Sequence, residues 1–140
     1  MPTFSVLVID DEVDFMETLA NRLKKRNIEA IGVASGEQGL AQLEARAFDI
    51  VLLDIKMPGG MGGLEVLREI RRCQPLAQVI LLTGHASLET SFEGMRLGAF
   101  DYLLKPVKFE ELLEKIATAL EKKSSVAGKS SDQADGDRQT

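Results

Sequence analysis

The sequence has few of the residues on which several classes of protein depend. Its 140 residues include one cysteine and one histidine. Cys73 therefore has no partner within the chain for a disulfide, and the chain is expected to be cytoplasmic. The same scarcity of sulfur and imidazole groups leaves no ligand cluster that would favour zinc.

A basic surface and a long apolar run are missing as well. Lysine and arginine total 17 against 22 aspartate and glutamate residues, a formal net charge of -5. This balance argues against direct binding to nucleic acid. The longest apolar runs have the length of strands, and residues 1–3 lack the basic start of a secretory signal. We therefore expect no membrane span and no export signal.

What the sequence does contain is a regular alternation of short apolar runs and helix-periodic segments. The runs, which predict strands, are residues 5–9, 28–33, 50–53, 78–83 and 99–104. Apolar residues at helical spacing follow within residues 15–23, 40–43, 64–70, 88–97 and 109–120. Five strands alternating with five helices predict an α/β fold, a doubly wound parallel sheet with helices on both faces.

The composition changes after Lys123. From Ser124 onward the residues are mainly Ser, Gly, Asp, Gln and Lys, and they cannot bury enough apolar surface to offset the entropy lost on ordering. We expect one domain over residues 1–123 and a disordered polar tail over residues 124–140, with no internal repeat.

Polar groups follow four of the predicted strands. The first strand ends in three acids at residues 10–12, the third in Asp54, the fourth in Thr83 and the fifth in Lys105. Because the carboxyl ends of parallel strands meet at one edge of a sheet, we expect these groups to lie together. Taken alone, Asp54 fits a reactive carboxylate and a simple loop cap about equally well.

Electrostatics indicates what such a cluster requires. At about 5 Å and an effective dielectric constant near 20, each pair of carboxylates repels by roughly 3 kcal/mol. Lys105 can neutralise one acid, and Mg²⁺, which prefers oxygen ligands, suits the others. A metal, an ammonium and a hydroxyl around one further carboxylate describe a phosphoryl-transfer site, in which an aspartate can be the nucleophile.

Four motifs in this order resemble a known family. They are Asp10-Asp11, Asp54 followed by Met57-Pro58, Thr83-Gly84, and the run GAFDYLLKP at residues 98–106. Over about residues 4–122 the chain resembles the receiver domain of two-component response regulators, whose fold is the flavodoxin-like or CheY-like (βα)5 sheet. A stand-alone receiver is the form we expect.

The resemblance implies a role for each group in a Mg²⁺-dependent reaction. Asp54 would accept a phosphoryl group from the phosphohistidine of a sensor histidine kinase or of a histidine phosphotransfer protein. Asp10, Asp11 and Asp54 would hold Mg²⁺ together with the main-chain carbonyl of Lys56. Glu12 is expected to be a helix-start charge rather than a ligand. The chain would be a phosphoacceptor and not a turnover enzyme.

The resemblance also implies a switch. Lys105 would pair with the phosphoryl group, and its bond to Pro106 would be cis. Thr83 would move its hydroxyl onto a phosphoryl oxygen and let Tyr102 turn inward. The face formed by the fourth helix, the fifth strand and the fifth helix would then change shape, for an unknown downstream protein or for a phosphorylation-dependent dimer.

Three further side chains are expected at the rim of the site, where they would affect the lifetime of the phosphoryl group: His85, Lys56 and Met57. The glycine-rich loop at residues 59–63 is one residue longer than is usual in the family, and we expect it to be mobile.

Two other functions share this fold class. A haloacid-dehalogenase-like phosphohydrolase also uses an aspartate nucleophile and Mg²⁺, but it places two acids one residue apart after its first strand, whereas Asp10 and Asp11 are adjacent. A flavin-binding electron carrier needs a phosphate loop after the first strand, where the three acids would repel a phosphate.

Overall fold

The computed structural model describes residues 4–139. Its elements are β1 (Ser5–Ile9), α1 (Val13–Lys25), β2 (Glu29–Val33), α2 (Gly36–Ala45), β3 (Ile50–Asp54), α3 (Gly63–Cys73), β4 (Gln78–Thr83), the short 3-10 helix η1 (His85–Ser87), α4 (Leu88–Arg96), β5 (Asp101–Leu104) and α5 (Phe109–Gln139). The alternation of strands and helices confirms the predicted α/β class.

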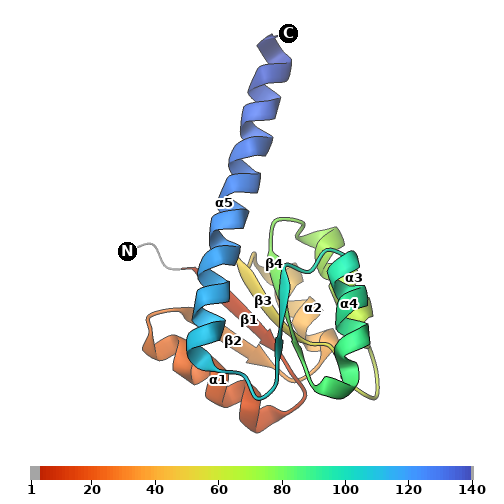
Figure 1. Cartoon of the computed structure of the whole chain (residues 1–140). Helices are drawn as coiled ribbons and strands as arrows, with labels where there is room; N and C mark the ends of the chain where they lie inside the picture. The colour runs from red at the N-terminus through yellow and green to blue at the C-terminus, as the bar shows by residue number, and fades with distance from the viewer. Residues whose placement is uncertain (1–3, 140) are drawn as a thin grey trace.

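The five strands form one parallel sheet in the order β2-β1-β3-β4-β5 (Figure 1). The chain winds outward in one direction from β1 to β2 and in the other from β3 to β5. The neighbouring strands β1 and β3 therefore form the point at which the winding reverses, where open α/β sheets handle ligands.

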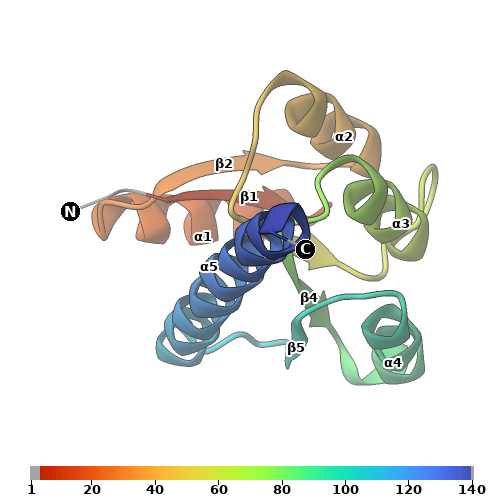
Figure 2. The ribbon, with the colours of Figure 1, turned by 90° about the horizontal axis from the view of Figure 1, so that it is seen from above.

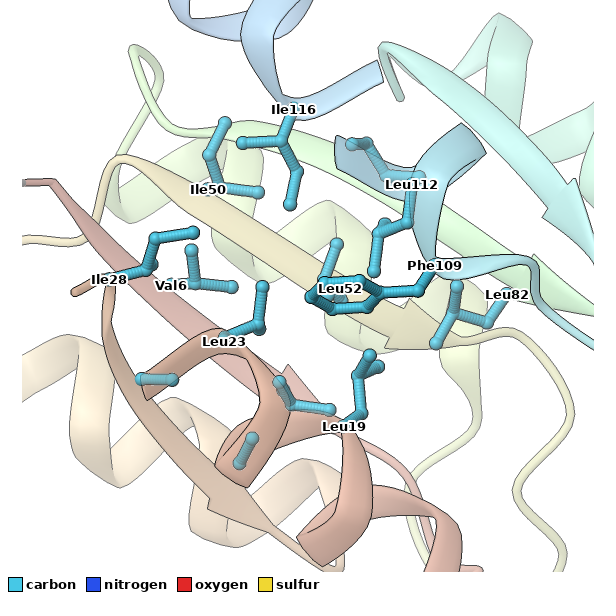
Figure 3. Packing of buried hydrophobic residues seen from close by; sticks show 14 of the residues in the cluster. Val6, Leu19, Leu23, Ile28, Ile50, Leu52, Leu82, Phe109, Leu112 and Ile116 are labelled. Carbon is cyan, nitrogen blue, oxygen red and sulfur yellow. The ribbon is translucent and has the colours of Figure 1, made fainter. Parts of the chain in front are cut away.

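Helices cover both faces of the sheet, as expected. Figure 2 shows α1 and α5 on one side and α2, α3 and α4 on the other. On the first side, Leu23, Leu52 and Leu112 belong to one buried apolar cluster that joins α1, the sheet and α5 (Figure 3). On the second side, Leu53 and Leu67 belong to another. Strands β1, β3 and β4 are buried throughout, because they receive side chains from both layers.

The start of α2 is stabilised by two side chains. The Ser35 hydroxyl accepts a hydrogen bond from the Gln38 amide at 3.1 Å, and the Gln38 side chain accepts one from the Ala34 amide at 3.0 Å. Two amides at the helix start are thereby satisfied, as in a capping box.

The C-terminal segment differs from the expectation. Helix α5 continues to Gln139 and extends away from the sheet (Figure 1) instead of giving way to a disordered tail at Ser124. Once a helix is nucleated by packing, each added residue costs little, and no proline interrupts this one. Lys123 of α5 ion-pairs with Asp49, the residue before β3. The domain boundary at residue 123 stays a prediction, and residues 1–3 and 140 lie outside the described part.

Within residues 4–139, no helix combines the length and apolarity that crossing a membrane would require.

Candidate functional site

The carboxyl ends of the strands deliver four functional side chains to one edge of the sheet. Asp10 directly follows β1, Asp54 and Thr83 are the last residues of β3 and β4, and Lys105 directly follows β5. Backbone pairing fixes them: the Ile55 amide donates to the Leu82 carbonyl at 3.0 Å, and the Lys105 amide donates to the Thr83 carbonyl at 2.7 Å. The predicted gathering of these groups is therefore present.

Lys105 lies among three carboxylates. Its ammonium nitrogen is 2.8 Å from Glu12 Oε1, 2.9 Å from Asp10 Oδ2 and 3.8 Å from Asp54 Oδ2. Burial alone would lower the pKa of Lys105, but contacts with Glu12 and Asp10 raise it. The lysine therefore stays charged and partly neutralises the acids. Its bond to Pro106 is cis, as the resemblance implied.

One carboxylate oxygen from each of three acids, Asp10, Glu12 and Asp54, lies within 4.8 Å of the other two. This is the spacing of ligands around one ion. Asp10 is completely buried, and its Oδ1 accepts a hydrogen bond from the Glu12 amide at 2.9 Å. Its Oδ2 is 2.9 Å from the Lys105 ammonium but has no well-aligned hydrogen bond among the described residues. An underused buried oxygen beside two other carboxylates fits Mg²⁺, which takes hard oxygen ligands.

The two acids after Asp10 are arranged differently from the expectation. Glu12 does occupy the start of α1, but its side chain caps no helix amide and turns instead to Lys105. Asp11 is exposed and lies outside the three-carboxylate cluster, although its side chain contacts Asp54 and raises the pKa of that carboxyl. The assignment of Asp11 as a metal ligand stays a prediction, and Glu12 joins the site.

The environment of Asp54 opposes its negative charge. Burial, and then the charge of Asp10, raises the pKa of Asp54 to about 7, although the Lys105 ammonium and a hydrogen bond from the Lys56 amide at 3.2 Å lower it. A carboxylate that must be ionised to act as a nucleophile is thus held near neutrality until more positive charge arrives.

This raised pKa predicts how stability depends on pH in EDTA. A carboxyl that holds its proton more tightly when folded stabilises the fold fully below its unfolded pKa, and that stabilisation is lost as the pH rises through the folded value. Raising the pH from about 5 to about 8 should therefore destabilise wild type relative to Asp54→Asn by about 2 kcal/mol. Urea unfolding of both proteins at each pH measures this. An equal difference at both pH values would contradict the raised pKa.

The assignment of Thr83 and Tyr102 as switch residues stays a prediction, and the structure shows the surroundings of both side chains. Thr83 is fully buried, and its hydroxyl donates to the Gly84 carbonyl at 3.0 Å. Tyr102 is half-buried, and its ring meets Phe92 of α4 edge-on, with centroids 5.9 Å apart. The tyrosine therefore contacts the helix that the expected switch would move.

Among the three rim residues, His85 and Lys56 are exposed beside the site, as expected. Met57 does not lie at the rim, because its side chain is only 7% exposed and packs in the apolar cluster on the α3 side. An unbranched apolar side chain next to that cluster is more stable inside it than over a polar site.

The glycine-rich loop is held in place at one point. Gly59 and Gly60 adopt positive φ angles of 74° and 99°, which glycine tolerates best. The Met61 amide then donates to Glu37 Oε1 at 2.9 Å, and the Met61 side chain packs against the core. Sequence reasoning missed Glu37, because nothing local connects an exposed acid of α2 to this loop.

Comparison with known proteins identifies the family to which this site belongs. The sequence matches the family described as response regulator receiver domain over residues 6–117. The chain belongs to this family. It is a receiver domain of two-component signalling, and its cluster of Asp10, Glu12 and Asp54 is typical of the magnesium site of such domains.

Individual relatives agree with this. The receiver is 36% identical over 115 residues to the transcriptional regulatory protein ZraR of Salmonella typhimurium, and the match covers 82% of the chain but 26% of ZraR. It thus spans about a quarter of that relative's length. A response regulator receiver domain protein from Clostridium thermocellum is 34% identical, with a TM-score of 0.82 over 88% of this chain and 98% of that one. A CheY-like receiver from Methanospirillum hungatei is 33% identical, with a TM-score of 0.83 over 89% and 98%.

Proposed function

We propose that this receiver accepts a phosphoryl group on Asp54 from a phosphohistidine of a sensor kinase or phosphotransfer protein, in a Mg²⁺-dependent reaction in the cytoplasm. The observation that carries the proposal is that the charged side chains of the site gather around Asp54. Its carboxylate ends a buried strand, lies 3.8 Å from the Lys105 ammonium and shares a 4.8 Å cluster with Asp10 and Glu12.

The chain's own residues supply most of the chemistry. An Asp54 oxygen attacks phosphorus, a P–O bond forms, the P–N bond to the donor imidazole breaks, and its electron pair leaves with that nitrogen. The Lys105 ammonium is placed to neutralise phosphoryl oxygens, and the Lys56 amide orients the carboxylate. Mg²⁺, held by Asp10 and Asp54 with Asp11, Glu12 and the Lys56 carbonyl as further candidates, would supply the remaining positive charge.

The proposal is tested by mass spectrometry after incubation with acetyl phosphate. We expect a single adduct that needs Mg²⁺, is prevented by EDTA and is removed by hydroxylamine, as an acyl phosphate would be. Continuous hydrolysis of many phosphate esters without such an adduct would instead indicate a phosphohydrolase and overturn the proposal.

The output surface we propose is formed by α4, β5 and α5. Phe92 of α4 is 46% exposed and Leu104 of β5 is 37% exposed, so apolar groups are available there for a downstream protein or a second copy of the chain. Tyr102 of β5, which contacts Phe92, is paired with Leu81, two residues before Thr83 on the neighbouring strand β4.

A substitution at Thr83 should separate phosphorylation from output. In Thr83→Ala the adduct should still form to within about threefold of wild type, because the hydroxyl is not the nucleophile. The response of the α4-β5-α5 surface to phosphorylation should be lost, since no hydroxyl can follow the phosphoryl oxygen. Amide chemical shifts of α4 and β5, with and without beryllofluoride, measure the response. Shift changes as large as those of wild type would show that Thr83 is not the coupling residue.

A further inference from the structure

Glu12 makes the shortest ion pair of the site, and the proposed reaction assigns no role to its contact with Lys105. Its carboxylate is 2.8 Å from the Lys105 ammonium, whereas the nearest oxygen of Asp54 is 3.8 Å away. The Glu12 side chain is 64% exposed, so it bounds the cluster on the solvent side, opposite the buried Asp10. In this state the lysine is held between Glu12 and Asp10, whose Oδ2 is 2.9 Å from the ammonium, and lies farther from Asp54, the residue with which it must later act.

The position of Glu12 is set by its backbone rather than by chance contact. Its amide donates to Asp10 Oδ1 at 2.9 Å, and its carbonyl accepts from the Met16 amide at 2.9 Å in the first turn of α1. Its carboxylate makes no capping bond that would compete for it. Both ends of the ion pair are therefore anchored, which reduces the entropy that usually weakens exposed pairs.

Lys105 is constrained on its own side. The side chain is only 18% exposed, and its ammonium lies 4.8 Å from the centre of the Phe15 ring. With the aromatic face on one side and carboxylates on the others, the ammonium pairs with Asp10 and Glu12 at the same time, and Asp54 is the more distant third carboxylate.

We propose that Glu12 is a positioning residue that, together with Asp10, holds Lys105 away from Asp54 in the resting state and must release it when a phosphoryl group occupies Asp54. The inference rests on the proposed function, because it assigns a competitor for the lysine that this reaction needs. Loss of the Glu12 charge then frees Lys105 for the phosphoryl group and strengthens the phosphorylated state.

Beryllofluoride, which imitates the phosphoryl group on an aspartate, provides the first test. At saturating Mg²⁺, Glu12→Gln should bind beryllofluoride about two- to fivefold more tightly than wild type, the range expected for losing one partly exposed competing ion pair. Asp14→Asn is the matched control, since Asp14 is an exposed acid in the first turn of the same helix. It removes the same charge and should leave the affinity unchanged. Equal or weaker binding by Glu12→Gln would overturn the proposal, and weaker binding would point to Glu12 as a metal ligand.

A double-mutant cycle shows whether the effect passes through Lys105. In a Lys105→Met background, Glu12→Gln should no longer change the affinity for beryllofluoride, because no ammonium remains to be released. The same gain in both backgrounds would mean simple relief of charge repulsion and would overturn a positioning role.

The resting position can also be tested without any ligand. Removing the Glu12 carboxylate should shift the side-chain NMR signals of Lys105 in EDTA, whereas Asp14→Asn should not. Unchanged Lys105 signals in Glu12→Gln would refute the hold of Glu12 on Lys105 even if phosphorylation proceeds normally. If instead those signals shift but wild type forms no adduct with acetyl phosphate, the proposed function fails while the contact stands.

Discussion

Asp54→Asn is expected to form no phosphoryl adduct with acetyl phosphate and Mg²⁺, a loss of at least about a hundredfold against wild type. The asparagine amide keeps the size of the side chain but cannot attack phosphorus as a carboxylate oxygen does. Two of the neighbouring acids are poorly placed to substitute: Asp10 is completely buried, and Glu12 is paired with Lys105. Intact-mass spectrometry of the two proteins measures the loss.

The matched control lies just before the other end of the same strand. Asp49 directly precedes β3, accepts a hydrogen bond from the Ser5 amide at 2.9 Å and ion-pairs with Lys123. Asp49→Asn should reduce stability and leave the adduct at the wild-type level, because it is remote from the carboxyl edge of the sheet. An adduct that persists in Asp54→Asn would assign the phosphoacceptor to a different residue.

The sequence predicted those parts of the site that depend on strand ends. An apolar run that stops at a polar residue fixes where a strand delivers that residue, and parallel order brings such ends together. The sequence alone therefore places four residues at one edge of the sheet: Asp10, Asp54, Thr83 and Lys105. Their meeting depends on backbone pairing, which short-range patterns describe well.

Side-chain direction could not be predicted in the same way. Whether Glu12 caps α1 or turns to Lys105, 93 positions away, depends on rotamers and on charges that meet only in the folded chain. The same applies to Met57, which the sequence placed at the rim and the fold buries, and to the anchor that Glu37 provides for Met61. The length of α5 was missed for another reason: composition indicates how much apolar surface is available, but not how far an already nucleated helix continues.

Strand-end placement and side-chain direction contribute differently to the site. Backbone pairing holds Asp10 and Asp54 close enough to repel each other, and the buried clusters on both faces of the sheet stabilise the fold against that repulsion. Lys105 is the cation beside this pair, and it also contacts Glu12. If Lys105 moves as proposed above, the site can respond to a new anion without rearranging the sheet.

Gly63→Ala should be the most damaging conservative change outside the carboxylates. A Cβ atom at Gly63 would lie 2.4 Å from the Ile55 carbonyl oxygen and 2.7 Å and 2.8 Å from two Ile55 backbone carbons. Backbone cannot rotate away as a side chain can, so we expect a loss of about 3 kcal/mol, the upper range for overpacking. That corresponds to a fall in melting temperature of about 10 °C. Because Ile55 directly follows Asp54, phosphorylation should slow as well.

Gly62, the residue before Gly63, provides a control that separates the backbone clash from the change of glycine to alanine itself. Gly62 is the residue before the first turn of α3, has a φ of -77° that any residue can adopt, and has open space where a Cβ would be. Gly62→Ala loses a favourable glycine at the helix start but makes the unfolded chain less flexible, so its net effect should stay within about 0.5 kcal/mol. Thermal and urea unfolding of the two variants measure the contrast. Equal stabilities would mean that α3 can move away from Ile55, and that close packing of these two backbones is not what holds the loop after Asp54.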